Sequence, residues 1–346
     1  MALQLFRNSY TNACGCALAV WLRITWRDVL DGQWGWSVVE ASRQTRQPIG
    51  VLGASSMVGQ CVLSQATKTH EPIYAFSRQA TALQADDRGG VVWQQIPLVP
   101  GGPSLAGHAI HCWICIAPIS ALPAHFAWLE ARGARRIVAL SSTSRFTKDT
   151  SSNAQEQAIA QKLAEAENKL QTWAESRGIE WIVLRPTLIY QPGQDKNVSE
   201  IARFIQRFRF FPVLGKAQGL RQPIHAADVA SACVTALQTP TVANRAYNIS
   251  GGETLPYRSM VGRIFAAQGR VTRVLSIPLW MFKWAVSLLR CLPRYHHWTT
   301  AMAERMNRDL VFDHTEATRD FGFQPRAFTL EQKSMPSAST QLLSNK

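Results

Sequence analysis

The chain has 346 residues, of which 46% are hydrophobic and 17% are charged, so it is long enough for one large domain or two smaller ones with a buried core. Its formal net charge is +14, but the basic residues are dispersed. This dispersal argues against a nucleic-acid footprint and favours a cleft for a phosphorylated ligand or contact with an anionic membrane surface. The seven cysteines are an odd and unclustered set, which predicts reduced thiols and a cytoplasmic protein.

Residues 1–47 differ from the rest of the chain. They contain four tryptophans and scattered arginines without a periodic pattern. The apolar run Ala13–Leu22 is too short to span a bilayer, and no small-residue cleavage site follows it. We expect an N-terminal extension outside the fold, with a peripheral membrane anchor as the alternative.

The stretch Pro48–Gly59 is the one around which the chain is organised. Its apolar run Ile49–Leu52 predicts a buried strand, and a helical spacing follows a turn of small residues. At such a turn, the N–H groups and the positive dipole end of the helix face a dinucleotide pyrophosphate. Gly53 permits the sharp turn, Gly59 permits close packing, and Ser56 stands where a glycine is usual. An ordinary strand-to-helix turn is the alternative. The predicted cofactor-binding residues of this turn are Gly53, Ser55, Ser56, Met57, Val58 and Gly59.

Strands and helices alternate from this turn onward. Continuous apolar strands separated by helices predict a parallel sheet that is covered on both faces. The predicted elements are the strands Ile73–Ser77, Val91–Trp93, Ile110–Ile116, Arg136–Leu140 and Trp181–Leu184, and the helices Leu122–Ala131, Ala154–Arg177 and Tyr257–Ala267. Cys112 and Cys115 form a C-x-x-C pattern inside a strand, where their side chains point to opposite faces, so we expect a structural role and no metal site.

Arg78 directly follows the second predicted strand. An acidic residue at this place would bind the ribose hydroxyl of NAD, whereas an arginine favours the additional phosphate of NADP. A solvated charge at the end of a strand is the alternative interpretation.

Several later stretches occur in an order that points to one family. They are Leu140–Ser144, Leu184–Gly193, Asn197, Arg221–Ala230 and Asp320–Arg326. With this order and spacing, residues 48–330 resemble the extended short-chain dehydrogenase/reductase family, which contains the NAD(P)-dependent nucleotide-sugar epimerases and dehydratases.

The resemblance implies an α/β fold with two domains. A Rossmann domain, built on a doubly wound parallel sheet, would occupy 48–190 plus about 221–250, and a smaller C-terminal substrate domain about 191–220 plus 251–330. The polar residues 331–346 would be a disordered tail.

The resemblance also assigns roles to residues near the cofactor. By position, Ala117 and Pro118 match the loop beneath the cofactor, and Pro186 and Tyr190 match the wall near the nicotinamide and the sugar.

Further residues match the substrate side of the family's site. Thr143 matches the catalytic Ser/Thr that hydrogen-bonds the substrate oxygen, and Asn197 and Arg221 match positions that hold the nucleotide diphosphate. We expect Asp228 to cap its helix rather than to take part in chemistry.

The catalytic Tyr-x-x-x-Lys pair of the family is missing from the long helix. None of the six tyrosines lies between positions 75 and 189, and none has a lysine four positions later. The helix offers Ala158 or Ile159 at the tyrosine place and Lys162 or Leu163 at the lysine place. The loss of a positioned general acid–base typically costs about a hundredfold to ten-thousandfold in rate.

Either another group supplies the proton, or the protein binds its cofactor without the usual turnover. The candidate replacements are Tyr190, Lys148 and Lys162. The pattern resembles the atypical branch of the family, which includes cofactor-binding sensors and a respiratory complex I subunit.

The segment Leu279–Leu292 is strongly apolar. At about fourteen residues it is too short to cross a bilayer, but its aromatic residues and flanking arginines suit a helix that lies in a membrane interface. The interpretation that we favour, however, is a helix that covers the substrate pocket or packs into the core.

Two functional hypotheses follow. The first is an oxidoreductase of the epimerase, dehydratase or reductase type that uses NADP, with NAD as the alternative, on a nucleotide sugar or a similar phosphorylated substrate. The second is a catalytically silent NADP(H)-binding sensor or assembly protein. We expect a small-molecule partner and no nucleic acid, in the cytoplasm; contact with the surface of the inner membrane and a homodimer are left open.

Overall fold

The computed structural model describes residues 47–67, 72–78, 90–96, 109–149, 151, 153–278, 280–281 and 305–330. All of them belong to one compact unit, Gln47–Lys346. The predicted N-terminal extension (apart from Gln47), the apolar segment at 279–292 (apart from 280–281) and the predicted tail at 331–346 lie outside the described residues.

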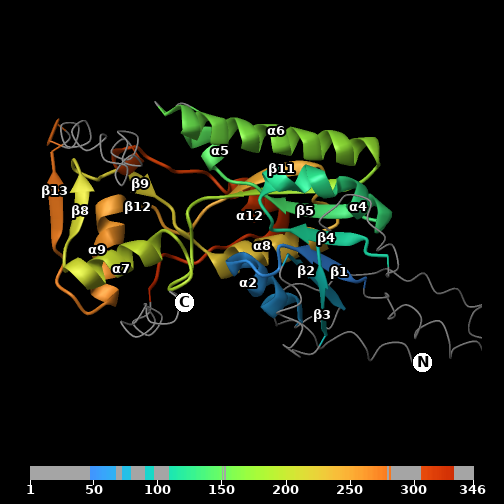
Figure 1. Ribbon diagram of the computed structural model, residues 1–346, viewed down its shortest axis with the longest axis horizontal. Coiled ribbons are helices and arrows are strands. Elements are labelled where there is room, and N and C mark those ends of the chain that lie inside the picture. Colours follow the sequence, from blue (N-terminus) through green and yellow to red (C-terminus); the bar gives the residue numbers. More distant parts are fainter. Residues whose placement is uncertain are drawn as a thin grey trace, which may run out of the picture. The chain divides into compact units, whose positions relative to one another are not determined.

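A seven-stranded sheet, parallel throughout, forms the centre of the unit (Figure 1). In spatial order its strands are β11 (Arg245–Ile249), β6 (Glu180–Pro186), β5 (Arg136–Leu140), β4 (Cys112–Cys115), β1 (Ile49–Leu52), β2 (Ile73–Ser77) and β3 (Val91–Gln95). The direction of winding reverses between β1 and β4, which pair side by side although β2 and β3 lie between them in the chain. The predicted doubly wound Rossmann sheet is confirmed.

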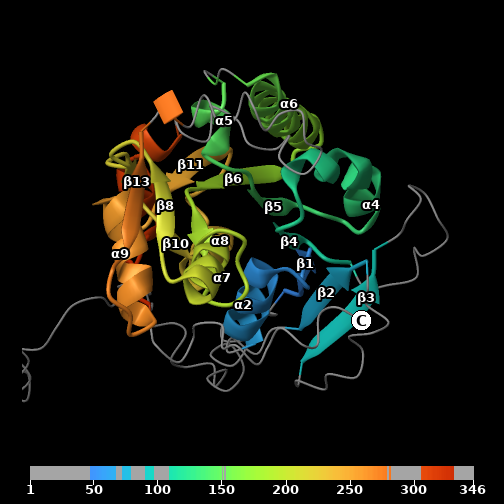
Figure 2. The ribbon, with the colours of Figure 1, turned by 60° about the vertical axis from the view of Figure 1, so that its left-hand side comes forward.

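Helices cover both faces of this sheet (Figure 2). Helices α2 (Met57–Ala66) and α8 (Ala226–Gln238) pack on one face, and the 3₁₀ helix η2 (Ile119–His125), α4 (Phe126–Ala131) and α6 (Ala154–Ser176) pack on the other. Along β1, Val51 belongs to the first core and Leu52 to the second, because successive side chains of a strand point to opposite faces. Cys112 and Cys115 divide between the two cores in the same way, as predicted, and neither forms a disulfide within the described residues.

Several predicted elements have different bounds in the structure, and two of them differ for a visible reason. The helix expected over Leu122–Ala131 begins earlier as the 3₁₀ turn η2, and Pro123, which lacks an N–H donor, lies inside that turn. The strand expected over Ile110–Ile116 is shorter, because the carbonyl of Ile110 instead accepts a hydrogen bond from the Trp113 indole at 2.7 Å.

The later part of the chain adds three two-stranded sheets. They pair β7 (Ile189–Tyr190) with β10 (Ile224–His225), β9 (Leu220–Arg221) with β12 (Leu255–Pro256), and β8 (Phe211–Leu214) with β13 (Val274–Ile277). Helices α5 (Ser144–Thr147), α7 (Val198–Phe208), α9 (Tyr257–Ala267) and α12 (Thr315–Phe321) complete the elements considered below. A separate core forms between α7 and α9, around Ile205 and Phe265. The division into Rossmann and substrate domains stays a prediction.

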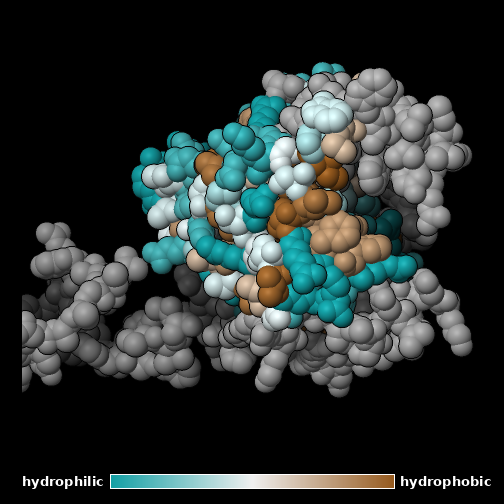
Figure 3. All heavy atoms as spheres, turned by 90° about the vertical axis from the view of Figure 1, so that its left-hand side faces the viewer, coloured by the Kyte–Doolittle hydropathy of each residue, from teal (hydrophilic) through white to brown (hydrophobic). Residues whose placement is uncertain are grey.

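The end of the unit that carries β8 and β13 displays hydrophobic side chains among hydrophilic ones (Figure 3). Phe208 is 48% exposed and Leu275 is 56% exposed, and the Arg207 guanidinium lies 5.5 Å from the centre of the Phe208 ring. Within the described residues, no helix is long and apolar enough to cross a membrane.

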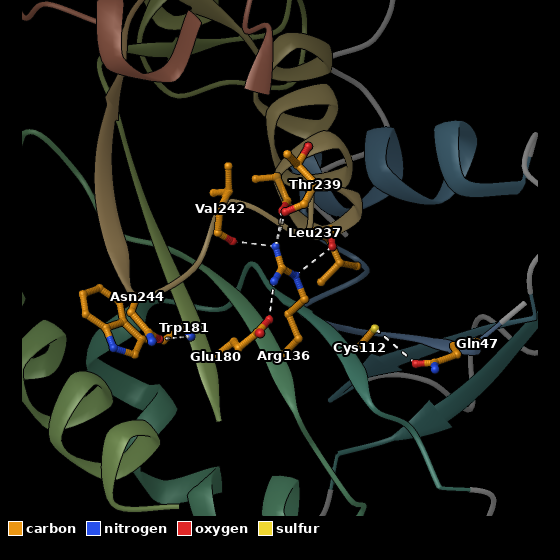
Figure 4. Close-up of polar contacts among 10 residues, drawn as sticks. Gln47, Cys112, Arg136, Glu180, Trp181, Leu237, Thr239, Val242 and Asn244 are labelled. Atoms are coloured by element: carbon orange, nitrogen blue, oxygen red, sulfur yellow. Dashed lines mark hydrogen bonds and ion pairs between the residues drawn. The ribbon is translucent and has the colours of Figure 1, made fainter. Parts of the chain in front are cut away.

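Arg136 fastens α8 to the sheet (Figure 4). It begins β5, and its buried guanidinium donates hydrogen bonds to the carbonyls of Leu237 at 2.8 Å, Thr239 at 2.6 Å and Val242 at 2.6 Å. It also forms an ion pair with Glu180 on β6. Carbonyls at the end of a helix have no partner within the helix, and a cation there is also favoured by the helix dipole. Arg136 therefore satisfies groups that would otherwise be buried without partners.

We predict that Arg136→Ala lowers the free energy of unfolding by about 3 kcal/mol, because several buried carbonyls lose their donor. Arg177→Ala is the matched control, since Arg177 is exposed and pairs only with the exposed Glu130, so its loss costs about 1 kcal/mol or less. Urea denaturation measures both. Equal effects of the two variants would contradict the proposed role of Arg136.

Candidate functional site

The backbone of the turn between β1 and α2 lies close to the backbone of the loop after β4. Gly53 has a φ of +86°, and a Cβ atom added there would lie 2.6 Å from the backbone nitrogen of Ala117. A Cβ atom on Gly59 would lie 2.5 Å from the carbonyl oxygen of Ala54. Both glycines are therefore required by the close approach of backbone to backbone. This turn stands at the point where the strand order reverses, which is where open α/β sheets bind their ligands.

Two serines in this turn are already hydrogen-bonded. Ser56 is the N-cap of α2, and its side chain accepts a hydrogen bond from the N–H of Gly59 at 3.1 Å. The Ser77 hydroxyl, at the end of β2, donates to the Ser55 hydroxyl at 2.9 Å. The remaining first-turn N–H groups, those of Met57 and Val58, have no carbonyl partner within an α-helix and can bind an anion. The turn thus fits a dinucleotide pyrophosphate.

The other predicted cofactor residues surround this turn. Ala117 donates its N–H to the carbonyl of Leu52 at 3.2 Å, and Pro118 precedes η2 as its N-cap. Arg78 is exposed and directly follows β2, as predicted. Residues 79–89, which follow it, lie outside the described residues.

A cavity of about 950 Å³ opens at the carboxyl ends of β5 and β6. It brings together five of the predicted site residues, which are Met57, Thr143, Pro186, Asn197 and Arg221. The start of α2, the loop after β5 and the later part of the chain therefore share one space. The lining also includes Ser141, Thr147, Lys148, Tyr257 and Arg305.

Thr143 is nearly buried and lies in the wall of this cavity. Its hydroxyl and its N–H both donate to the carbonyl of Pro186, each at 3.1 Å. This pair of bonds fixes the side chain and leaves the oxygen lone pairs of the hydroxyl to accept a hydrogen bond from a ligand.

The buried carboxylate of Glu167 on α6 connects this helix to α5 and β6. Glu167 on α6 accepts hydrogen bonds from Arg185 on β6, the closest at 2.6 Å, and pairs with Arg145 on α5. It also accepts the hydroxyl proton of Ser141, which lines the cavity. No signal in the sequence identified this cluster, because a glutamate on a polar helix resembles a solvated residue.

Lys148 follows α5 and lies half-buried in the cavity wall. Burial lowers the pKa of its ammonium group, the nearby Glu156 carboxylate opposes that shift, and Arg305 adds to it. Glu156 is itself buried, accepts the Ser151 hydroxyl at 2.7 Å and pairs with Arg305 at 3.1 Å.

Arg221 lines the cavity but is also tied to the chain around it. Its guanidinium donates to the carbonyls of Leu220 at 2.7 Å and Arg308 at 2.8 Å, and to that of Arg305. It lies 5.5 Å from the centre of the Tyr257 ring, and burial raises the pKa of that tyrosine to about 12. Much of the donor capacity of Arg221 is therefore used inside the protein.

Two predicted catalytic residues are not brought to the cavity. Tyr190 is fully buried, its hydroxyl is directed at the carbonyl of Thr329 at 3.5 Å, and burial raises its pKa. Lys162 is exposed on α6. Neither belongs to the lining of the cavity.

Acidic residues near α7 and α8 hold the backbone in place. Asn197 is the N-cap of α7, but the buried Asp195, which sequence reasoning missed, accepts the N–H groups of Asn197 at 2.8 Å and Ser199 at 3.1 Å. The exposed Asn197 side chain makes no capping bond.

The prediction that Asp228 caps its helix is wrong. The side chain of His225 caps α8 by accepting the N–H of Ala227 at 3.1 Å. Asp228 instead accepts hydrogen bonds from the backbone and the guanidinium of Arg326, at 3.0 and 2.8 Å, and thereby holds the C-terminal segment.

The described residues include no group of three or more His, Cys, Asp or Glu side chains placed to hold a metal ion.

The family resemblance is confirmed by comparison with known proteins. Residues 126–250 match the model of the NAD dependent epimerase/dehydratase family. A UDP-glucose 4-epimerase of Vibrio cholerae is 27% identical over 120 residues, which are 35% of this chain and 37% of that protein. The match thus spans little more than a third of that relative's length.

Solved structures show the same fold over most of the chain. A UDP-glucose 4-epimerase from Thermotoga maritima, solved with UDP-glucose, has a TM-score of 0.59 at 14% identity, and the match covers 81% of this chain and 94% of that one. A dTDP-glucose 4,6-dehydratase from Bacillus anthracis, solved in complex with NAD, has a TM-score of 0.58 at 14% identity, with 83% and 93% covered.

We predict that Glu167→Gln lowers the melting temperature by about 5 °C or more, because the two partly buried guanidinium groups of Arg145 and Arg185 lose the carboxylate with which they pair. Glu165→Gln is the matched control, since Glu165 is exposed on the same helix and its loss has little effect. Thermal unfolding followed by circular dichroism measures both. A melting temperature unchanged in Glu167→Gln would refute the structural role of the cluster.

Proposed function

We propose that this protein is an NAD(P)-dependent oxidoreductase of the epimerase/dehydratase type that acts on a nucleotide sugar or a similar phosphorylated substrate. One observation carries the proposal: a single cavity joins the start of α2, where a dinucleotide would lie, to Thr143 and Arg221. The family match and the nucleotide-sugar enzymes among the structural neighbours support the same substrate class.

The turn Gly53–Gly59 would hold the pyrophosphate of the cofactor through the first N–H groups of α2. Ala117, Pro118 and Pro186 would form its surroundings toward the cavity. When bound, the nicotinamide dinucleotide would supply the hydride acceptor. We propose NADP as the preferred cofactor, because Arg78 follows β2 and is exposed to a ligand, and NAD as the alternative.

On the substrate side, Thr143 would orient the reacting oxygen by a hydrogen bond from its hydroxyl, which would turn from the carbonyl of Pro186 toward that oxygen. Asn197 and the free donor capacity of Arg221 would hold the diphosphate, with Arg305 as a further cation of the same cavity. In the proposed division of the chain, the Rossmann domain would supply the cofactor-binding residues together with Thr143 and Arg221, and the C-terminal substrate domain would supply Asn197 and Arg305.

The second candidate function is a silent NADP(H)-binding protein. It is favoured by the absence of the Tyr-x-x-x-Lys pair on α6, where Ile159 is exposed and Leu163 packs into the core. The exposed Phe208 beside Arg207 is compatible with a peripheral contact at an anionic membrane surface. The free cysteines of the described residues support a reducing, cytoplasmic setting.

We expect the purified protein, supplied with NAD⁺ or NADP⁺, to change the nicotinamide absorbance or to isomerise the sugar when UDP-glucose, UDP-N-acetylglucosamine or dTDP-glucose is added. Thr143→Val should slow this turnover about a hundredfold, because the reacting oxygen loses its polar partner. Thr172→Val, at an exposed position of α6, is the matched control.

The outcomes of this experiment separate the two functions. Saturable binding of the dinucleotide without turnover of any sugar nucleotide in the panel would rule out the enzyme and support the silent NADP(H)-binding protein. Absence of dinucleotide binding would remove both.

We predict that Arg78→Ala weakens binding of NADPH about tenfold and leaves the affinity for NADH nearly unchanged, because only NADPH carries the phosphate that Arg78 would contact. Fluorescence titration of the reduced nicotinamide measures both affinities. Arg177→Ala, which removes an exposed arginine distant in sequence from Arg78, serves as the control for a general loss of positive charge. Equal weakening of both cofactors by Arg78→Ala would contradict a preference for NADP.

A further inference from the structure

We propose that the side-chain amine of Lys148 exchanges the proton with the substrate oxygen in the cavity, in place of the tyrosine that the long helix lacks. The inference rests on the proposed function. Of the three replacement candidates, Lys148 alone lines the cavity, whereas Tyr190 is buried elsewhere and Lys162 is exposed.

The position of Lys148 follows from the short helix α5. The loop after β5 delivers Thr143 to the cavity, and one helical turn later Thr147 and Lys148 line the same cavity. The N–H of Lys148 donates to the carbonyl of Ser144 at 3.1 Å, and its own carbonyl accepts from Ser151 at 3.2 Å. The backbone that carries Lys148 is thereby fixed on both sides, at the wall that also carries Thr143.

The charges around Lys148 come from several elements. Glu156 projects from α6, Arg305 belongs to the C-terminal part of the chain, and both act on Lys148. Arg308 donates to the carbonyl of Thr147 at 3.4 Å, and Lys196 lines the same cavity before α7. Asp195, although it lines the cavity as well, is occupied by the backbone of α7.

This setting suits a proton acceptor. Burial and Arg305 lower the pKa of Lys148, and Glu156 only opposes them, so that more of the amine is neutral near neutral pH than in an exposed lysine. A lysine with a lowered pKa is a known form of general base. Glu156 is also engaged by Ser151 and Arg305, so its carboxylate does not neutralise Lys148 alone.

The proposed step balances as an alcohol oxidation. The O–H bond of the substrate breaks and its proton forms a new N–H bond with the lone pair of Lys148. The C–H bond breaks at the same carbon, and its hydride, with two electrons, passes to the oxidised nicotinamide while the C=O bond forms. In the reverse direction the Lys148 ammonium returns the proton to the carbonyl oxygen.

The test compares Lys148→Met and Lys148→Arg with wild type on the nucleotide-sugar panel above. Both variants should lower kcat about a hundredfold or more with KM little changed, since methionine has no proton to exchange and arginine stays protonated. Lys169→Met, at an exposed position of α6, should retain wild-type kcat. In wild type, kcat for oxidation should rise with pH through the pKa of Lys148, and this limb should disappear in Lys148→Met.

A second readout does not depend on activity. After reductive ¹³C-methylation of the lysines, the NMR signal that Lys148→Arg lacks should titrate at lower pH than the signal that Lys169→Arg lacks. The proposal is overturned if Lys148 titrates together with Lys169, or if Lys148→Met keeps kcat within threefold of wild type. An inactive wild type would instead overturn the proposed function, and with it any proton transfer to a substrate.

Discussion

The buried carboxylate of Glu167 is the interaction on which the geometry of the candidate site depends. It attracts Arg145 from α5 and Arg185 from β6 to one point on α6, and it also holds the Ser141 hydroxyl. A carboxylate with so little access to water is stable only when such donors surround it. Because α5 carries both Thr143 at its start and Lys148 at its end, the ion cluster beneath it fixes the spacing of the groups that face a ligand.

Local chemistry made the fold predictable. The apolar run Ile49–Leu52, the need for a positive φ at Gly53 and the tight packing at Gly59 are all encoded within a dozen residues. The ion clusters were not predictable in this way. Arg136 donates a hydrogen bond to the carbonyl of Leu237, which is 101 positions later, and the sequence around neither residue indicates that the two are partners. Arg221 was expected to bind a ligand, but its bonds to the carbonyls of Leu220 and Arg308 appear only when the chain has folded.

The long helix α6 packs on the sheet and also holds neighbouring elements in place. Its face toward the sheet is preserved by apolar residues such as Leu170, and its buried glutamate holds the neighbouring elements. The place expected for the tyrosine carries Ala158 or Ile159, both of which are exposed. The place expected for the lysine carries Lys162, which is exposed, or Leu163, which packs against the core. In this protein α6 therefore supports the cavity mechanically, and the polar groups that face the cavity near Thr143 come from the neighbouring short helix α5.

Arg136 and Thr143 mark the two ends of the stretch that runs through β5. The strand has five residues and is about 17 Å long, so the contact that fastens α8 lies well away from the cavity. The guanidinium clamp and the candidate ligand cavity thus lie at opposite ends of β5. For a protein engineer, this separation means that cavity residues outside the Glu167 cluster can be varied while the clamp at the other end of the strand continues to hold α8 to the sheet.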